Sequence, residues 1–326
     1  MGKQKQLCIN ESRCIKCRLC EKACPAGAMK FVGTNAANTT RVFDKSKCIR
    51  CGLCAEVCPK NVLFFAYENE GNTLSLSKVP PFRLKIEKFS EIKEFDTTVE
   101  TIQYITNKVI LLRLRLKDSD TFKFLSGQYA DLHFNKFFLR PYSISSTPQE
   151  AINNKFIEFT IELVDKGAGS EEIKKLKVGE NLKISGPYGT MIIDDRTIEE
   201  PYIFIATGTG LAPFMSIIED MLISNTKSPI TLIFGVASET DVFYLEELKE
   251  LTAKYPSFNY QVMFSRPTGE GAKYKGRVTD FLKNLNLTNP NTRIYICGKA
   301  EMIDDSVQII KDKGLTSRYI YYEKFL

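Results

Sequence analysis

Eight cysteines near the start of the chain form two runs with the same spacing, 34 residues apart, and a proline follows the last cysteine of each run. The runs consist of Cys14, Cys17, Cys20 and Cys24, and of Cys48, Cys51, Cys54 and Cys58. A cuboidal 4Fe–4S cluster needs four thiolates at its iron corners, and three closely spaced cysteines can surround one such cluster. The pattern therefore predicts two 4Fe–4S clusters and electron transfer as their chemistry.

Each run resembles the cysteine motif of bacterial two-cluster ferredoxins. The resemblance implies that the fourth ligand of each cluster comes from the other run. The first cluster would then be held by Cys14, Cys17, Cys20 and Cys58, and the second by Cys48, Cys51, Cys54 and Cys24. Disulfides or zinc sites are the alternatives, but they do not account for regular triples that are followed by Cys-Pro.

Composition places the chain among multidomain globular proteins. Its 326 residues suggest two or three domains, and 43% apolar residues is an ordinary content. We expect no membrane span and no secretion signal. Eight of the ten cysteines are expected to bind clusters, and such clusters favour a reducing cytoplasm. Residues 1–67 hold 12 Lys or Arg but only 4 Asp or Glu. This excess predicts a basic face for an acidic protein that donates or accepts electrons, and its scatter among the cysteines argues against nucleic-acid binding.

The pattern of apolar and polar residues changes along the chain. Residues 1–67 are expected to form an α+β ferredoxin-like domain, and residues 68–90 a linker. Alternating strands at 109–116 and 156–163 predict an antiparallel β-barrel over 91–197. Over 198–326, short apolar strands at 202–206, 230–234 and 293–297 are each followed by a helical pattern. These predict a parallel α/β sheet, the usual architecture of a nucleotide-binding domain.

A candidate cofactor site lies in the barrel segment. Arg140 offers a fork of donors for phosphate, Tyr142 a flat face, and Ser143 a hydroxyl. Gly169 and Ser170 precede a helical stretch from 171, where backbone N–H groups can approach a pyrophosphate. The segment 186–189 then predicts a tight turn that ends the barrel.

These elements, in this order, resemble the flavin domain of the ferredoxin–NADP reductase family, and the resemblance covers residues 91–326. It implies that FAD is bound by Arg140, Tyr142, Gly169 and Ser170, with Ser143 near the flavin N5. In the second domain, the glycine-rich loop with Gly208, Thr209, Gly210 and Pro213 resembles the family's nicotinamide-nucleotide loop.

Further resemblances concern the hydride-transfer region and the nucleotide. Cys297, in a Cys-Gly pair, would lie beside the reacting atoms, although a buried apolar role is the alternative. Glu323 and Phe325 resemble family endings that approach the flavin, whereas here the chain ends in Phe-Leu and simple strand packing is the alternative. Ser265, Arg266, Lys273 and Tyr274 would contact the nucleotide, and the last three could clamp a 2′-phosphate. That clamp slightly favours NADPH, but relatives that use NADH also carry Ser-Arg-Pro.

The resulting hypothesis is an NAD(P)H-dependent oxidoreductase in which FAD passes single electrons to two 4Fe–4S clusters and then to a protein acceptor, such as an oxygenase. Ser143, Cys297 and Glu323 are the candidate catalytic residues. The reverse direction, from reduced ferredoxin to NAD(P)+, stays open. The alternatives are an electron-wiring subunit of a larger hydrogenase or dehydrogenase complex and, more remotely, a redox sensor.

Overall fold

The chain divides into two compact units, Met1–Phe89 and Ser90–Leu326, and each is described by itself. The computed structural model describes residues 5–9, 18–22, 24, 27–33, 40–44, 47, 54, 63–67, 92–117, 119–135, 138–193, 199–269, 274–315 and 319–325. Side chains are included except those of 5–9, 19, 22, 64–67 and 325. The predicted linker at 68–90 lies outside the described residues.

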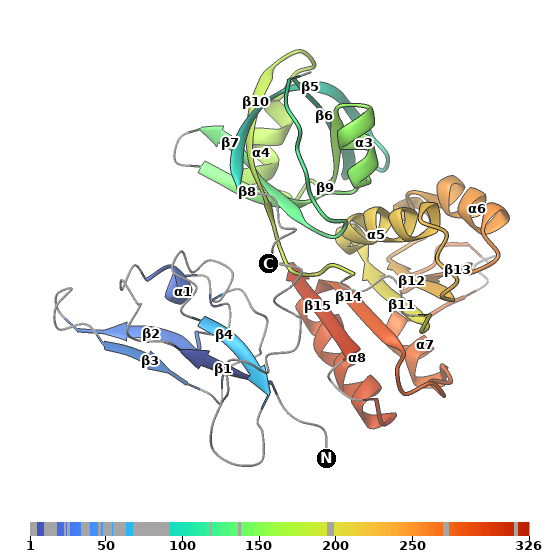
Figure 1. Cartoon of the computed structure of the whole chain (residues 1–326). Coiled ribbons are helices and arrows are strands. Elements are labelled where there is room, and N and C mark those ends of the chain that lie inside the picture. The colour runs from blue at the N-terminus through green and yellow to red at the C-terminus, as the bar shows by residue number, and fades with distance from the viewer. Residues whose placement is uncertain are drawn as a thin grey trace. The chain divides into compact units, whose positions relative to one another are not determined.

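The N-terminal unit contains two small antiparallel sheets (Figure 1). Strand β1 (Lys5–Ile9), which precedes the first cysteine run, pairs with β4 (Leu63–Tyr67), which follows the second run. Strands β2 (Met29–Val32) and β3 (Thr40–Phe43) lie between the runs, and α1 (Leu19–Lys22) belongs to the first. The pairing of β1 with β4 joins the segment before the first run to the segment after the second run.

The second unit begins with a six-stranded antiparallel sheet in the order β8-β7-β10-β5-β6-β9. Its strands are β5 (Lys93–Tyr104), β6 (Val109–Leu116), β7 (Tyr129–Asn135), β8 (Phe138–Ser143), β9 (Phe156–Glu162) and β10 (Asn181–Tyr188). Ile144, just beyond one edge strand, bridges to Phe159 on the other edge strand, so the sheet curls into a barrel. Alternate residues such as Leu112, Leu114 and Leu132 are fully buried inside it, which confirms the predicted period-two pattern.

Two details of the barrel differ from the sequence prediction. The segment 186–189 does not form a tight turn: β10 runs to Tyr188, with a register shift between Ser185 and Tyr188 against β7. Helix α4 (Ala168–Lys175) begins before the predicted start at 171, because Gly167 already takes the capping position. Gly169 and Ser170 therefore lie in the first turn of the helix. The barrel also holds α3 (Pro148–Asn153), whose capping box joins Thr147 and Glu150.

The remainder of the second unit is a five-stranded parallel sheet in the order β13-β12-β11-β14-β15. The strands are β11 (Tyr202–Thr207), β12 (Ile230–Val236), β13 (Phe258–Phe264), β14 (Arg293–Lys299) and β15 (Ile320–Phe325). Between them lie helices α5 (Ala212–Ile223), α6 (Leu245–Lys254), α7 (Val278–Asn284) and α8 (Ala300–Asp312), with short 3-10 helices η5 (Gly208–Leu211) and η6 (Glu239–Asp241). This confirms the predicted α/β architecture.

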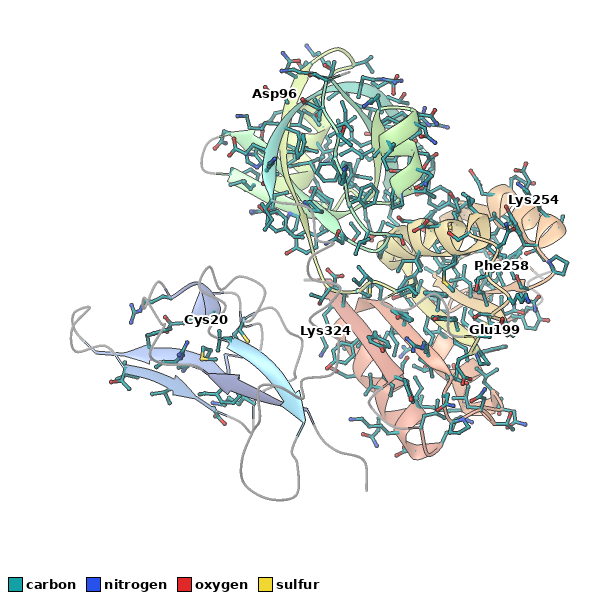
Figure 2. The ribbon with its side chains drawn as sticks, viewed as in Figure 1. Cys20, Asp96, Glu199, Lys254, Phe258 and Lys324 are labelled. Carbon is teal, nitrogen blue, oxygen red and sulfur yellow. The ribbon has the colours of Figure 1, made fainter. Side chains whose placement is uncertain are left out.

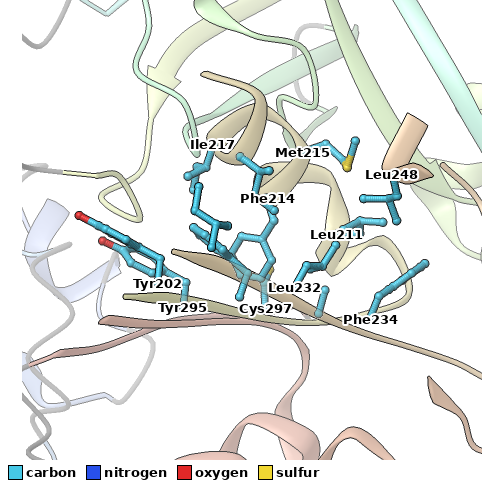
Figure 3. Packing of buried hydrophobic residues seen from close by; sticks show 14 of the residues in the cluster. Tyr202, Leu211, Phe214, Met215, Ile217, Leu232, Phe234, Leu248, Tyr295 and Cys297 are labelled. Atoms are coloured by element: carbon cyan, nitrogen blue, oxygen red, sulfur yellow. The ribbon is translucent and has the colours of Figure 1, made fainter. Parts of the chain in front are cut away.

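Both faces of the parallel sheet are buried, which explains its nearly continuous apolar strands. One face forms a core with α5 that includes Phe214 and Tyr295 (Figure 3). Phe204, Phe214 and Tyr295 have no exposed surface in this core. The other face packs Ile205 and Ile296 against α7 and α8. Within the described residues, no helix is long and apolar enough to span a membrane.

The barrel and the parallel sheet contact each other through apolar and polar residues. Val109, at the start of β6, belongs to the core around α5, and Ile105 packs against it. On the barrel strand β9, Thr160 Oγ1 hydrogen-bonds to the hydroxyl of Tyr244, which precedes α6, over 2.6 Å. The second unit is therefore one folded body in which the two predicted cofactor-binding parts share a buried interface.

Candidate active site

The end of strand β8 carries three of the predicted cofactor residues. Arg140 is exposed, and its guanidinium lies 4.1 Å from the centre of the Phe138 ring while Nη1 donates to the Leu139 carbonyl over 2.9 Å. Tyr142 packs against the barrel core, and burial raises the pKa of its hydroxyl, partly offset by Arg140. Ser143 is buried at the end of the strand. Packing therefore holds the Tyr142 side chain in place, and its hydroxyl is protonated at neutral pH.

Helix α4 brings a fourth predicted residue to this strand end. A β-carbon on Gly169 would lie 2.7 Å from Tyr142 Oη and 3.3 Å from Arg140 Cγ. A larger residue would displace the phenol at this point, and the first turn of the helix offers backbone donors to an anion. Ser170 is buried, and its Oγ accepts the Val164 N–H over 2.8 Å, which orders the chain into the helix. The phenol, the guanidinium and the start of the helix lie together here, and donors of these kinds fit the diphosphate of FAD.

The glycine-rich loop η5 follows the central strand β11 and leads into α5. Gly208 takes a left-handed φ of +54°, which favours glycine. Gly210 lies against the backbone of Cys297 and Gly298, with no space for a β-carbon. Thr209 lies between them in η5, and Pro213 is in the first turn of α5, where its missing N–H costs no hydrogen bond. A glycine-rich loop at the carboxyl end of a central parallel strand fits a dinucleotide pyrophosphate.

Cys297 and Glu323 lie opposite each other on the neighbouring strands β14 and β15. The Cys297 side chain is fully buried in the core beneath α5 (Figure 3). Burial raises the pKa of its thiol well above the ordinary value, and the charge of Glu323 adds to this rise. The thiol is therefore neutral and acts as packing surface rather than as a nucleophile. Phe325 ends β15, and its side chain lies outside the described residues.

The remaining predicted nucleotide residues are in the loop after β13. Ser265 and Arg266 are exposed, and their N–H groups donate to the carbonyls of Val236 and Ala237 over 3.0 and 2.7 Å. Tyr274 closes the loop, since its carbonyl accepts the Phe264 N–H over 3.2 Å. Lys273 lies outside the described residues.

Some charged residues near the glycine-rich loop carry no sequence signal. A Glu162 carboxylate oxygen lies 3.7 Å from the position of a β-carbon on Gly208. Lys108, in the β5–β6 turn, pairs with Glu162 over 3.8 Å and with Asp241 of η6 over 3.3 Å. No motif marks these residues, because they come together only when the barrel packs on the parallel sheet.

In the N-terminal unit, three predicted cluster ligands are described. Cys20 (Figure 2) and Cys54 are buried with Met29 and Phe31, and Cys24 packs against this group. The Ala28 N–H points at Cys24 Sγ over 3.2 Å, a contact that stabilises a thiolate and tunes iron–sulfur clusters. Cys20 is assigned to the first cluster and Cys24 and Cys54 to the second, and the described residues alone complete neither set of ligands. The other predicted ligands, Cys14, Cys17, Cys48, Cys51 and Cys58, lie outside the described residues.

Comparison with protein families matches each part of the chain. Residues 6–69 match the 4Fe-4S dicluster domain, residues 96–193 the oxidoreductase FAD-binding domain, and residues 204–308 the oxidoreductase NAD-binding domain. Among solved structures, a ferredoxin NADP+ reductase from Neisseria gonorrhoeae with bound FAD and NADP superposes with a TM-score of 0.61 at 23% identity, covering 72% of this chain and 99% of that one. A cytochrome P450 reductase from Amycolatopsis superposes with a TM-score of 0.66 at 24% identity, covering 72% and 70%. These likenesses confirm the fold of the second unit.

Two curated relatives have a higher sequence identity to this chain than these solved structures do. The ferredoxin–NAD(P)+ reductase component of the naphthalene 1,2-dioxygenase system of Pseudomonas putida is 33% identical over 230 residues, which cover 70% of this chain and 68% of that protein. The toluate 1,2-dioxygenase electron transfer component of the same species is 28% identical over 233 residues, covering 71% and 67%. The chain therefore belongs to the ferredoxin–NADP reductase family of FAD- and NAD-binding oxidoreductases, with an N-terminal 4Fe–4S ferredoxin domain in the same polypeptide.

Proposed function

We propose that this oxidoreductase takes electrons from NAD(P)H and passes them through FAD and two 4Fe–4S clusters to a protein acceptor, such as an oxygenase. The observation that carries this proposal is the packing of the start of α4, at Gly169, against Tyr142 and Arg140 in the same folded unit as the glycine-rich loop. Relatives named as a reductase component and as an electron transfer component of dioxygenases support the class of partner. The dicluster motif supports the count of two clusters.

The proposed roles of the site residues follow from their surroundings. A bound flavin supplies the conversion between two-electron and one-electron transfer. Arg140 and the first turn of α4 hold its diphosphate, and Tyr142 supports its ring. Ser143 provides a buried hydroxyl at the strand end, and Glu323 lies opposite Cys297 on the neighbouring strand β15. Because the Cys297 side chain is neutral and fully buried, its contribution is to pack beneath α5 and to support the glycine-rich loop, whose Gly210 lies against its backbone.

The proposal includes the domain limits and the cellular setting. We assign residues 1–67 to the ferredoxin domain, 68–90 to the linker, 91–197 to the FAD barrel and 198–326 to the nucleotide domain. The net positive charge of residues 1–67 favours an acidic surface on the partner. Thiolate-ligated clusters favour the reducing cytoplasm.

Anaerobic stopped-flow reduction by NADH and by NADPH tests the proposal. We expect rapid loss of flavin absorbance, followed by slower loss of cluster absorbance. Oxidised clusters beside fully reduced flavin would indicate the opposite physiological direction, and a flavin that neither nucleotide reduces would refute the proposal.

The variant Cys14→Ser tests the order of the carriers. It should remove one cluster but keep NAD(P)H-dependent ferricyanide reduction, because ferricyanide accepts electrons from the flavin directly. Loss of this activity while FAD stays bound would contradict the proposed order.

A further inference from the structure

Glu239, in the 3-10 helix η6, holds a loop that follows a different strand. Its Oε2 accepts hydrogen bonds from the Thr268 N–H over 3.0 Å and from the Thr268 hydroxyl over 2.8 Å, and its Oε1 accepts the Gly269 N–H over 3.2 Å. The bond from the Thr268 backbone, together with the other two, lowers the pKa of Glu239 to about 2. The carboxylate is therefore charged at physiological pH, and both of its oxygens are engaged by the loop.

The loop that Glu239 holds is the one that carries Ser265 and Arg266. Its base is closed on β13, because Phe264 N–H donates to the Tyr274 carbonyl and Gly276 N–H donates to the Phe264 carbonyl. Its first residues are fastened to the end of β12 by the bonds from Ser265 and Arg266. Glu239 adds a third attachment, two residues beyond Arg266. The three attachments together fix the backbone on both sides of the guanidinium.

The position of the loop makes it suited to one end of the nucleotide. Strands β12 and β13 are parallel neighbours, and β12 is next to β11, whose carboxyl end carries the glycine-rich loop. Ligands of open α/β sheets bind across such carboxyl ends. An arginine in the loop beyond β13 is therefore placed for an anion at the adenosine end of a nucleotide.

Arg266 is suited to bind such an anion. It is exposed, and no carboxylate pairs with it in the part of the chain that the structure describes. The Glu239 carboxylate accepts hydrogen bonds from Thr268 and Gly269, and no ion pair with the Arg266 guanidinium is present among the described residues. Glu239 thus keeps the loop in place without neutralising the group that would bind phosphate.

We propose that Glu239 is a positioning residue for the recognition of a 2′-phosphate, acting through Thr268 and Gly269 to hold Arg266 in place. This inference rests on the proposed function, since it assumes that a nicotinamide nucleotide binds here. It implies discrimination in favour of NADPH that depends on a residue with no direct contact to the nucleotide. The alternative role, a carboxylate that accepts the ribose 2′-hydroxyl and repels a 2′-phosphate, predicts the opposite effect of substitution.

The experiment uses the full-length holoprotein and two small probes, adenosine 2′,5′-bisphosphate and 5′-AMP. Their affinities are measured by titration calorimetry, alongside KM for NADPH and NADH. The variants are Glu239→Ala, Glu239→Gln and Thr268→Val. Glu246→Ala is the matched control, because Glu246 is an exposed glutamate on α6 that pairs only with Lys249 among the described residues.

We expect Glu239→Ala to weaken binding of the bisphosphate and to raise KM for NADPH by about tenfold, the effect of losing hydrogen bonds to a charged acceptor. Affinity for 5′-AMP and KM for NADH should stay within about twofold of wild type, since neither has a 2′-phosphate. Glu239→Gln should recover part of the loss because its amide oxygen can still accept from Thr268, and Thr268→Val should show a smaller loss. Glu246→Ala should change nothing.

Three results would overturn the inference. One is a wild-type protein that binds both probes equally. Another is an equal loss for both probes in Glu239→Ala, which would mean that Glu239 only supports the general fold of the loop. The third is tighter binding of the bisphosphate to Glu239→Ala. The proposed function has a separate test, because reduction of the flavin by either nucleotide in the wild-type protein does not depend on this discrimination.

Discussion

Ser126 of the barrel donates a hydrogen bond of 2.7 Å to the Asp220 carboxylate of helix α5, and both side chains are almost fully buried. The neighbouring Gly127 packs so closely on α5 that a β-carbon would lie 2.8 Å from Ile217 Cδ1. Helix α5 starts directly after the glycine-rich loop. The contact therefore joins the flavin-binding part to the element that positions the nucleotide loop.

We expect Ser126→Ala to destabilise the holoprotein by about 1–3 kcal/mol, since a buried carboxylate loses one of its donors. Urea unfolding followed by flavin fluorescence measures the change, because release of FAD reports loss of the shared interface. Ser119→Ala, at an exposed serine that hydrogen-bonds only to the adjacent Asp120 among the described residues, is the control. An unfolding midpoint equal to that of wild type would show that the bond contributes nothing to the interface.

Features that repeat locally could be predicted from the sequence. The strands at 109–116, 202–206, 230–234 and 293–297 were found, because each carries an unbroken pattern of burial along the chain. The cysteine runs and the glycine-rich loop were recognisable from spacing alone. The family comparisons confirm the domain types, and the individual site residues remain predictions.

Contacts between distant segments could not be predicted in this way. Ser126 and Asp220 are 94 residues apart, and Thr160 and Tyr244 are 84 apart. Glu239 resembles any exposed glutamate until the fold places Thr268 beside it. The prediction of a tight turn at 186–189 was wrong, because glycine and proline also occur at irregularities within strands, as in β10.

The contact between Gly169 and Tyr142 can be tested by a double substitution. We expect Gly169→Ala to weaken FAD binding about tenfold or more, because the new methyl group would lie 2.7 Å from the tyrosine hydroxyl. Combining it with Tyr142→Phe removes the atom in conflict and should restore part of the affinity. Equilibrium titration of the apoprotein with FAD measures both. If Tyr142→Phe restored nothing, the loss would come from the helix itself.

Arg140→Ala should also weaken FAD binding, since the guanidinium is the charged donor at this strand end. Its stacking on Phe138 pre-orders the side chain, so Arg140→Lys should recover only a fraction of the affinity. The flavin-to-protein ratio after purification is the measurement. Complete flavin retention in the alanine variant would contradict the assignment of Arg140 to the diphosphate.

Cys297 should resist alkylation in the native protein. Its side chain is fully buried, and burial raises its pKa, so the reactive thiolate is scarce even at pH 8.5. Peptide mapping after iodoacetamide treatment should show Cys297 unlabelled before denaturation and labelled after it. Rapid labelling of the native holoprotein would show that the thiol is accessible and would reopen a chemical role for it.

The stability of the protein should depend on pH through Glu219 on α5. Burial, together with the charges of Glu150, Glu158 and Glu247, raises the pKa of this carboxyl from 4.5 to about 8. Between these two values the folded protein holds a proton that the unfolded chain has lost, so stability falls as the pH rises through this window. Above pH 8 the Glu219 carboxylate is charged in the folded protein as well, and the full free-energy cost of this buried charge is present.

Glu219→Gln removes this titration, and the variant should therefore gain stability over wild type as the pH rises. We expect little difference at pH 5 and an advantage of about 2 kcal/mol at pH 8.5, since each unit of pKa shift corresponds to about 1.4 kcal/mol and partial solvent contact reduces the total. Urea unfolding at the two pH values measures it, with Glu250→Gln on the exposed part of α6 as the control. An advantage independent of pH would mean that the pKa of Glu219 is not raised in the folded protein.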